Sequence, residues 1–329
     1  MMHTRKSAMC DLGERFTGPH LRVVASTSTV PMALGSQPFE AVTLPPPRLG
    51  DYRVLALLAK GGMGGVYLGE HVVTGERVAI KVLDARWAAH DSIVARLMGE
   101  YEVSQRVSHE GLVRIHAASQ SEDVPYLLME VLDGENLASL LGRSQIELGA
   151  VAAIGAQVAD AVAAMHDARV VHCDLKPENV MVLYRDGLAG WPRAKVLDFG
   201  VARFDESLAI QEIAGTPCYM APEQWRGHAE ARSDVYALGC LLYELATGRA
   251  PFEGPIAQVM ADHHDRLPPA ISTHRVVPGS FDRLVSRMLA KEPGMRPRMN
   301  EIARSLADVA YAMPPGARGG AWCAAAGSR

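Results

Sequence analysis

The feature that most constrains this chain is the order of five short segments along it. They are Lys60-Gly-Gly-Met-Gly-Gly-Val-Tyr67, Val78-Ala-Ile-Lys81, His172-Cys-Asp-Leu-Lys-Pro-Glu-Asn179, Asp198-Phe-Gly200 and Ala221-Pro-Glu223. Any one of them could arise by chance in an unrelated protein. Together they supply a glycine-rich turn, a lysine and several oxygen-bearing side chains that can handle the phosphates of a nucleotide. The order therefore predicts a site for moving a phosphoryl group, built from distant parts of the chain.

Composition places the chain among ordinary globular proteins. Of its 329 residues, 48% are hydrophobic and 21% are charged, which is enough for a sizeable core. The net charge of −4 gives no electrostatic reason to bind nucleic acid, so we expect no nucleic-acid partner. No run of about 18 consecutive apolar residues is present, so we expect no membrane insertion. Arg5 and Lys6 are followed by no apolar stretch, which argues against a secretory signal.

The cysteine pattern indicates a reducing compartment. The cysteines are scattered and include no CxxC pair: Cys10, Cys173, Cys218, Cys240 and Cys323. An odd, dispersed set argues against a disulfide framework and against a zinc site. We therefore expect a cytoplasmic protein. His263 and His264 are expected on a surface helix with no third ligand, so we assign them no metal.

The chain divides into a leader, an ordered part and a tail. Residues 1–50 are rich in Ser, Thr, Pro and Gly without periodicity, which predicts a flexible, disordered leader. Residues 312–329 are predicted to be a disordered tail. Between them, a strand-rich N-lobe at 51–132 precedes a helix-rich C-lobe at 133–311. That order of elements is typical of an α+β protein with two lobes.

Hydrophobic periodicity predicts the individual elements. Strands are expected at Tyr52–Ala59, Val66–His71, Val78–Leu83, Val113–Ala118 and Tyr126–Val131. Helices are expected at Ile93–Val107, Glu147–His166, Arg232–Thr247, Ile256–Asp265, Phe281–Ala290 and Arg298–Tyr311. The helix at 147–166 is apolar on all sides, so we expect it inside the helical lobe.

The glycine-rich segment and the lysine after it are the first candidates for phosphate binding. Glycines let backbone N–H groups approach anions because no Cβ blocks the way, although a flexible hairpin is the alternative. Lys81 ends the next predicted strand, where its ammonium can bind phosphates, and this favours the binding interpretation. Glu100 is expected to hold Lys81 because it follows Leu97 on the side of its helix that faces the sheet. Glu102 is the rival candidate.

Residues 170–182 read as strand, loop and strand, which predicts a polar loop at a rigid edge. In this loop, Asp174 can accept the proton of an attacking hydroxyl, Lys176 can neutralise the moving phosphate, and Asn179 can ligate metal. The alternative is an Asx-rich turn with Asn179 as a cap. Asp198 ends another predicted strand and can hold Mg²⁺ between phosphates, which disfavours that alternative.

Taken together, these segments resemble the eukaryotic-like (Hanks-type) protein kinase family over about residues 51–311. Gly61-Gly-Met-Gly64 and Gly215-Thr-Pro-Cys-Tyr-Met-Ala-Pro-Glu-Gln224 resemble its bacterial serine/threonine branch. The resemblance implies a bilobal fold with a small antiparallel N-lobe sheet, one main N-lobe helix and a larger helical C-lobe. It also implies phosphorylation of serine and threonine hydroxyls on protein substrates in signal transduction, with ATP and Mg²⁺ as cofactors.

The resemblance assigns roles to individual residues. Asp174 would be the catalytic base, Lys176 would stabilise charge, and Asn179 and Asp198 would hold the metal. The nucleotide would be bound by Leu58, Gly61, Gly62, Gly64, Val66, Ala79, Lys81, Glu100, Met129, Glu130 and Leu132. Within that set, Met129 resembles the gatekeeper, and the backbone from Glu130 to Leu132 resembles the adenine-binding hinge.

Further positions match the family outside the nucleotide site. Glu223 resembles the acid that pairs with a late arginine, here Arg296. Asp234 and Gly239 match the helix that anchors the catalytic loop. Thr216 resembles the threonine that touches the catalytic aspartate and the substrate site, so its replacement is expected to be costly.

Two other functions are open at this point. A pseudokinase would bind nucleotide and signal by interaction alone, but retention of Lys81, Asp174, Asn179 and Asp198 weighs against it. A small-molecule kinase is disfavoured because residues 215–224 resemble a peptide-docking segment. A regulatory partner protein is expected to bring the signal to this chain.

Two positions depart from the family pattern. Ala59 occupies the first glycine of the phosphate loop, where it needs only an ordinary strand conformation, so a modest effect on nucleotide affinity is expected. Cys173 stands where most relatives carry the arginine that pairs with a phosphate on the activation segment. Its thiol is either a redox switch or a small buried apolar residue, and apolar neighbours favour the second interpretation.

The missing arginine predicts that activity depends little on phosphorylation of the activation segment. Ser207 is the only hydroxyl residue between Asp198 and Gly215. We expect Ser207→Ala to leave kcat/KM nearly unchanged in a steady-state kinase assay. A loss of about tenfold or more would show that a phosphate at this position is needed after all.

Overall fold

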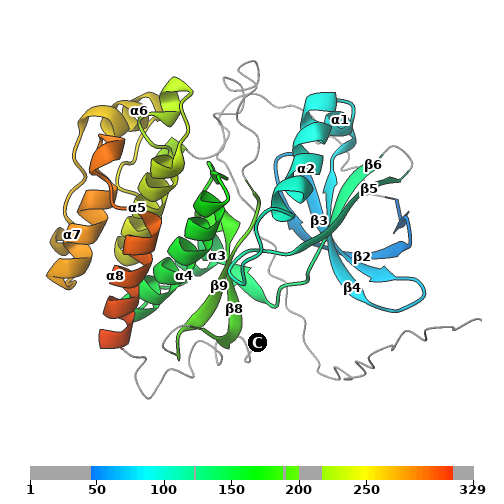
Figure 1. Ribbon diagram of the computed structural model, residues 1–329, viewed down its shortest axis with the longest axis horizontal. Coiled ribbons are helices and arrows are strands. Elements are labelled where there is room, and N and C mark those ends of the chain that lie inside the picture. The colour runs from blue at the N-terminus through cyan, green and yellow to red at the C-terminus, as the bar shows by residue number, and fades with distance from the viewer. Residues whose placement is uncertain (1–45, 122–123, 188–189, 200–216, 314–329) are drawn as a thin grey trace, which may run out of the picture.

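Two lobes lie side by side along the long axis of the molecule, one mostly strands and the other mostly helices (Figure 1). The structure is a computed structural model that describes residues 46–121, 124–187, 190–199 and 217–313. The predicted leader and tail fall outside these ranges, apart from their few residues nearest the folded part. The two-lobed α+β prediction is confirmed.

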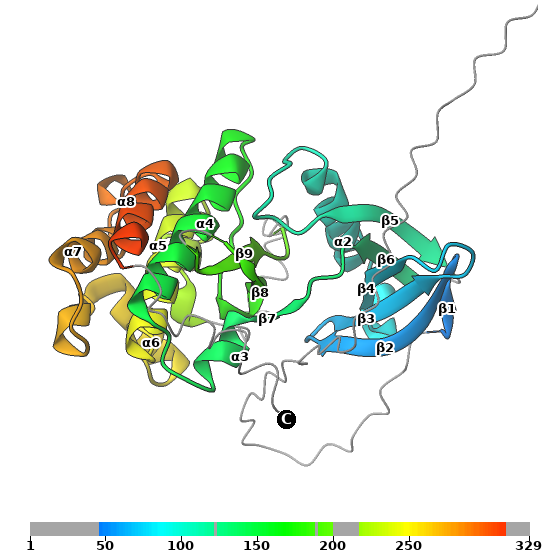
Figure 2. The same cartoon turned by 90° about the horizontal axis from the view of Figure 1, so that it is seen from below.

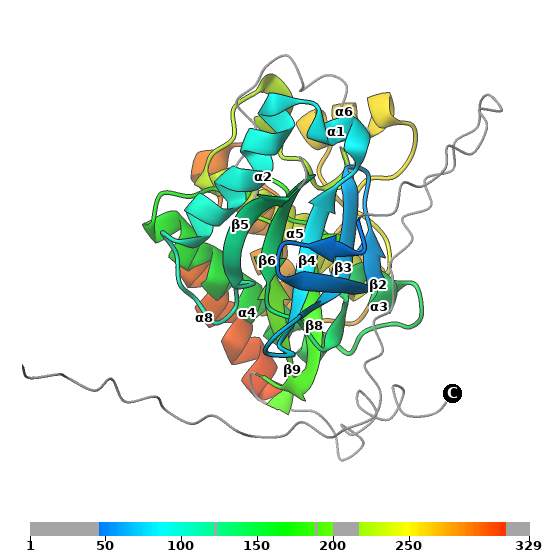
Figure 3. The same ribbon diagram turned by 90° about the vertical axis from the view of Figure 1, so that its right-hand side faces the viewer.

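The first lobe is an antiparallel sheet with one long helix packed on it (Figures 2 and 3). Its strands, in spatial order, are β1 (Arg48–Leu49), β2 (Tyr52–Lys60), β3 (Gly64–His71), β4 (Arg77–Leu83), β6 (Val124–Met129) and β5 (Ile115–Ser121). The helices of this lobe are α1 (Ala85–Ala88) and α2 (Asp91–Ser104). The longer helix, α2, contacts β5 and β6.

The pleat of β4 sends its side chains to two different clusters. Ile80 and Val82 belong to an apolar cluster on one face of the sheet. Ala79 and Leu83 belong to the main core on the other face. Because side chains alternate along a strand, Lys81 lies on the face that it shares with Ala79 and Leu83. The core pattern therefore fixes the direction of the lysine.

The buried face of α2 includes a carboxylate. Its buried residues are Ile93, Leu97, Glu100 and Val103, a spacing that follows one side of a helix. Glu100 is 9% exposed and lies on the same side as the apolar anchors. Packing of the apolar residues against the sheet therefore carries Glu100 inward with them, whereas Glu102 is exposed.

The second lobe is a group of helices with a short sheet at its boundary (Figure 1). The helices are α3 (Leu137–Leu141), α4 (Leu148–Asp167), α5 (Ala231–Thr247), α6 (Ile256–Asp265), α7 (Gly279–Met288) and α8 (Met299–Ala312). The sheet consists of β7 (Gly134–Asn136), β8 (Val180–Asp186) and β9 (Pro192–Val196), in that order and antiparallel.

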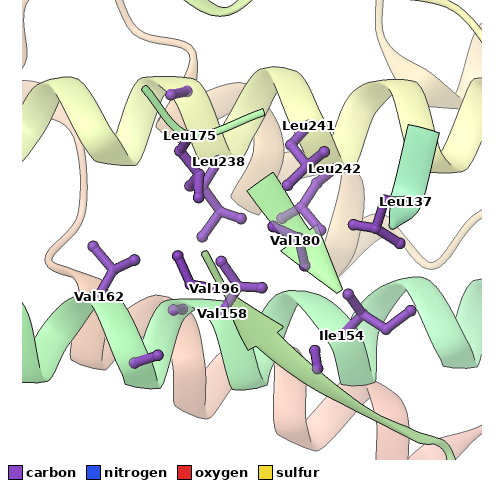
Figure 4. Close-up of a cluster of buried hydrophobic side chains, with 14 of the residues drawn as sticks. Leu137, Ile154, Val158, Val162, Leu175, Val180, Val196, Leu238, Leu241 and Leu242 are labelled. Carbon is purple, nitrogen blue, oxygen red and sulfur yellow. The ribbon is translucent and has the colours of Figure 1, made fainter. Parts of the chain in front are cut away.

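The centre of this lobe is α4, which packs against α5, α8 and β9. It is the one helix, among the described residues, that is long and apolar enough to cross a membrane, but 78% of its apolar window is buried in the protein. Gly155 lets α5 approach closely, since a Cβ there would lie 2.6 Å from Leu242 Cδ2. Figure 4 shows Ile154, Val158 and Val162 of α4 facing the core side chains of α5 and the short sheet. The helix is thus a core helix, as the sequence predicts.

The structure differs from the predicted elements in several short segments. Residues 170 and 171 form no strand. Arg169 has φ 60°, so the chain turns sharply at the end of α4, and Val170 N–H donates to Met165 O at 2.9 Å. The elements β1, α1, β7 and α3 were not predicted because each is too short to show periodicity.

His263 does not lie on a surface, and the expectation that it would is wrong. It lies on α6 and is 0% exposed. Tyr236 OH lies 2.9 Å from its Nδ1, and the Phe252 ring packs edge-on against it at 4.9 Å. Burial, helped by the nearby Lys291 ammonium, lowers the pKa of His263 to about 3. A buried, neutral histidine is a structural residue of the helical lobe.

Because His263 is buried and neutral, we predict that the folded protein loses stability in mild acid. An unfolded chain takes up a proton on His263 as the pH falls through about 6.5, whereas the folded chain does so only near 3. The free energy of unfolding should therefore fall by about 2 kcal/mol between pH 7 and pH 5 through this residue alone. The measurement is chemical denaturation at several pH values of the wild type and of His263→Asn, which cannot titrate. The difference in the free energy of unfolding between the wild type and His263→Asn should become smaller as the pH falls. A difference that does not change with pH would contradict the account.

Candidate active site

One ammonium group joins three distant segments of the chain. Lys81 Nζ lies 2.9 Å from both carboxylate oxygens of Glu100 and 2.7 Å from Asp198 Oδ1. Lys81 comes from β4 of the first lobe, Glu100 from α2, and Asp198 from the residues that follow β9 of the second lobe. The structure thus brings these three predicted residues together and pairs Lys81 with Glu100 rather than with Glu102.

The charges of this cluster depend on one another. Burial by itself would lower the pKa of the Lys81 ammonium, but Asp198 and Glu100 outweigh burial and hold the pKa above its ordinary value. Burial would raise the pKa of Asp198, but contact with Lys81 brings it below the ordinary value. Burial raises the pKa of Glu100 to about 7, and the charge of Lys81 opposes this only in part. Lys81 is therefore a cation at neutral pH.

The short sheet of the second lobe brings Asn179 and Asp198 to one edge. Asn179 precedes β8 and Asp198 follows β9, and the register pairs Val180 with Val196. In an antiparallel pair, the start of one strand meets the end of the other. Leu197 N–H donates to Asn179 O at 2.8 Å, which continues the pairing by one residue. Asp198 is the next residue along the chain.

Asp174 lies within the same group. Its Oδ2 accepts hydrogen bonds from Lys176 Nζ at 2.8 Å and from Asn179 Nδ2 at 3.2 Å. Asn179 Nδ2 also donates to Asp174 O at 2.8 Å. These bonds hold the carboxylate of Asp174 in one orientation and leave it half-exposed, with 36% of the side chain accessible. A half-exposed, oriented carboxylate can accept a proton from a hydroxyl.

A buried aspartate of α5 holds the backbone of the loop that carries Asp174. Asp234 is 1% exposed and accepts the backbone N–H groups of His172 at 2.9 Å and Cys173 at 2.8 Å. His166 Nε2, at the end of α4, lies 2.8 Å from the same carboxylate. His172 in turn lies 3.0 Å from the carbonyl of Leu197, which precedes Asp198. Asp234 thus anchors the loop, as the resemblance implies.

Two residues of the site have left-handed backbone conformations. Cys173 has φ 65° and Asp198 has φ 51°, values that residues other than glycine rarely adopt. Each costs about 1–3 kcal/mol unless the surroundings hold it. The hydrogen bond from Cys173 N–H to Asp234 and the ion pair of Asp198 with Lys81 are such supports. The strain therefore falls on the two segments that carry the candidate base, Asp174, and the candidate metal ligand Asp198.

Cys173 itself is half-buried rather than fully buried. Its Sγ lies 3.6 Å from Val171 O, and its carbonyl accepts a hydrogen bond from Gln224 Nε2 at 3.0 Å. The sequence places Gln224 at the end of the segment that resembles the family, but it does not predict this contact with Cys173. Cys240 is 0% exposed and is a core residue.

The glycine-rich turn joins β2 to β3. Only Gly64 among its three predicted site glycines is required by the protein's own packing, since a Cβ there would lie 2.0 Å from Val82 O. A Cβ at Gly61 would come no closer than 3.7 Å to another atom, and one at Gly62 would meet nothing within 4 Å. Room at these two positions is consistent with a turn that covers a ligand.

The residues that the resemblance assigns to adenine lie around one part of the first sheet. Leu58, Ala79 and Met129 are buried in the main core, and Val66 and Leu132 are partly buried against it. The register pairs Ala79 with Met129, and Val66 with Lys81. Val66, Ala79 and Met129 therefore lie on the face of the sheet that also carries the lysine.

The side chain of Glu130 does not join this group. Its Oε1 accepts a hydrogen bond from Arg114 N–H at 2.8 Å and contacts Lys195 Nζ. Its own N–H donates to Arg114 O at 3.0 Å. The backbone, not the carboxylate, is what Glu130 can offer to a nucleotide. Gly200, Ser207 and Thr216 lie outside the described residues.

A second ion pair stabilises the helical lobe behind the site. Arg296 is 2% exposed and contacts both carboxylate oxygens of Glu223, at 2.6 and 2.9 Å. Its remaining donors reach the carbonyls of Ala290, Arg232 and Lys291. A buried charge is tolerated when it is paired and fully hydrogen-bonded in this way. The predicted pairing of Glu223 with Arg296 is confirmed. Gly239 of α5 allows close packing, since a Cβ there would lie 3.0 Å from Leu289 Cδ2.

The oxygen donors at this edge fit a magnesium ion. Asn179 uses its Nδ2 on Asp174, which leaves its amide oxygen for a metal, and 45% of the Asp198 side chain is exposed. Across the described part of the chain, no cluster of three or more His, Cys, Asp or Glu residues forms. A site with few protein ligands suits Mg²⁺, which retains waters and takes further oxygens from substrate phosphates.

Comparison with known proteins decides the family. A family model described as the protein kinase domain matches residues 52–306. The chain belongs to the protein kinase family. This kinase chain is 41% identical over 272 residues to the serine/threonine-protein kinase Pkn1 of Myxococcus xanthus, covering 80% of the chain and 39% of that relative. It is 37% identical over 274 residues to pkn2 of the same organism, covering 78% of the chain and 32% of that relative.

A solved structure supports the same conclusion. The crystal structure of the Mycobacterium tuberculosis PknI kinase domain matches this kinase chain with a TM-score of 0.63 at 27% identity. The match covers 82% of this chain and 99% of that one. The chain spans only about a third to two fifths of the length of the Myxococcus relatives, so the similarity concerns their kinase domains.

Proposed function

We propose that this protein transfers the γ-phosphoryl group of ATP to serine or threonine hydroxyls of protein substrates, as part of signal transduction. The observation that carries the proposal is the contact of Lys81 with Glu100 and Asp198 at once. This contact aligns a phosphate-binding cation from one lobe with a metal-binding carboxylate from the other. Both are needed for phosphoryl transfer in this family.

Each polar residue has a distinct task in the proposed reaction. Lys81, held by Glu100, binds the α- and β-phosphates and orients the nucleotide. Asn179 and Asp198 would hold Mg²⁺, which would supply positive charge against the phosphates. Leu58, Val66, Ala79 and Met129 bind adenine, together with the backbone from Glu130 to Leu132. Gly61, Gly62 and Gly64 let the turn approach the phosphates.

The hydroxyl of the substrate is activated on the side of the transferred phosphoryl group that faces away from the nucleotide. Asp174 accepts its proton, because its carboxylate is oriented by Lys176 and Asn179 and remains half-exposed. Lys176 also offsets negative charge on the moving phosphoryl group. Because Lys176 lies 2.8 Å from Asp174, one ammonium serves both tasks.

The proposal extends to the location and the partners of the kinase. We propose a cytoplasmic kinase, since ATP is available there and Cys173, Cys218 and Cys240 form no disulfide. We also predict a regulatory protein that brings the signal to the kinase. The phosphorylation of serine and threonine side chains on protein substrates is likewise a prediction.

Replacement of Asp174 tests the proposal. We expect Asp174→Asn to lower the rate of phosphoryl transfer by about a hundredfold or more, because the hydroxyl loses its base. Binding of Mg·ADP should persist, since Asp174 is not assigned to the nucleotide. The assay uses the purified full chain with labelled ATP, Mg²⁺ and a generic basic protein substrate, and titration calorimetry for Mg·ADP.

Asp160→Asn is the matched control, because Asp160 lies on α4 with 66% of its side chain exposed, away from the site. It should transfer phosphate at the wild-type rate. Equal rates for Asp174→Asn and the wild type would contradict the assignment of the base. A wild type that binds Mg·ADP and transfers nothing would instead establish the pseudokinase alternative.

A further inference from the structure

Two side chains of α1 hold the glycine-rich turn. Arg86 Nη2 donates to Gly62 O at 3.1 Å, and Trp87 Nε1 donates to the same oxygen at 3.2 Å. One residue further along, Met63 O accepts the backbone N–H of Asp84 at 2.9 Å. Two successive carbonyl groups of the turn are therefore bound to the segment that joins β4 to α2.

These contacts also set the direction of two backbone N–H groups. The carbonyl of Gly62 and the N–H of Met63 belong to one planar peptide unit and point in opposite directions. The same holds for the carbonyl of Met63 and the N–H of Gly64. Because both carbonyls are held on the α1 side, both N–H groups point away from α1. Successive N–H groups that point the same way form a concavity that binds anions.

Packing alone does not set this orientation. A Cβ at Gly61 or Gly62 would find room, so neighbouring atoms do not confine these residues. Glycine samples many backbone conformations at similar free energy, and only an added interaction selects one of them. The donors from Arg86 and Trp87 supply that interaction at Gly62.

The two donors are themselves held in place. The Arg86 guanidinium lies 5.4 Å from the centre of the Trp87 ring and 3.6 Å from Asp84 Oδ2. Trp87 is partly buried against the main core, and its backbone N–H donates to Asp84 O at 2.8 Å. His90, which comes three residues after Trp87, is the N-cap of α2, the helix that carries Glu100. The turn and the partner of Lys81 are thus attached to one continuous stretch of chain.

We propose that Arg86 and Trp87 are positioning residues for the phosphates of the nucleotide. They fix the carbonyl of Gly62 so that the N–H groups of Met63 and Gly64 are preset to bind phosphate oxygens. This proposal rests on the proposed function insofar as it assumes a nucleotide beneath the turn. It requires binding only, not transfer.

Trp87→Phe tests the proposal most cleanly, because it retains an aromatic ring and removes only the indole N–H and part of the ring. The loss of one hydrogen bond that selects the bound conformation should weaken Mg·ADP binding about fivefold. Adenosine has no phosphates, so its affinity should stay at the wild-type value. Both dissociation constants are measured by titration calorimetry on the full chain, with the melting temperature as a check on folding.

Trp191→Phe is the matched control. Trp191 is 2% exposed in the second lobe, remote from the turn, and should lose no affinity for either ligand. Arg86→Lys keeps the positive charge but not the planar donor, so a loss of Mg·ADP affinity there points to the hydrogen bond and not to charge. Retention of wild-type affinity in Arg86→Lys would overturn the role given to Arg86.

Two results would overturn the proposal for Trp87. One is unchanged Mg·ADP affinity in Trp87→Phe, and the other is an equal loss for adenosine and Mg·ADP, which would indicate a general structural role. Its failure is distinguishable from failure of the proposed function. A protein that binds Mg·ADP but transfers no phosphate would refute the function, and the comparison of the two ligands would still decide the role of Trp87.

Discussion

The pairing of the Lys81 ammonium with two carboxylates is the interaction on which the rest of the structure depends. A cation removed from water is costly unless it is paired, and Lys81 is paired with Glu100 and Asp198. Each carboxylate reaches it by a different route. Glu100 is carried inward by the apolar face of α2, and Asp198 is placed by the end of β9. The ion pairs therefore form only when the sheet, the helix and the second lobe are all in register, and they report that the site is assembled.

The loop that carries Asp174 depends on a different kind of support. Asp234 is buried in α5 and accepts two consecutive backbone N–H groups of the loop, which keeps Cys173 in a left-handed conformation. The loop therefore needs no sheet of its own, and residues 170 and 171 form none. The buried pair of Glu223 and Arg296 stabilises the same lobe from a different position. Rigidity beneath the loop leaves Asp174 half-exposed and yet oriented, which suits the proposed role of this carboxylate as a base.

Much of this arrangement could be predicted from the sequence, because it follows from repeated patterns. The alternation in β4 and the helical spacing in α2 set the faces that carry Lys81 and Glu100, so their meeting could be expected. The sequence does not show that His263 is buried, because the buried side of α6 contains few apolar residues that would mark it. The contacts of Arg86, Trp87 and Gln224 could not be predicted, since each side chain donates to a backbone carbonyl that no sequence pattern marks. The short elements β1, α1, β7 and α3 lack the length to show a period.

A double-mutant cycle on Lys81 and Glu100 tests the central claim most directly. The dissociation constant of Mg·ADP is measured by calorimetry for the wild type, Lys81→Met, Glu100→Gln and the double variant, with Glu102→Gln as the exposed control. If Glu100 acts by holding Lys81, the double variant binds no more weakly than Lys81→Met, and the coupling free energy is about 1 kcal/mol or more. Losses that simply add, or a Glu102→Gln variant as impaired as Glu100→Gln, would contradict the account.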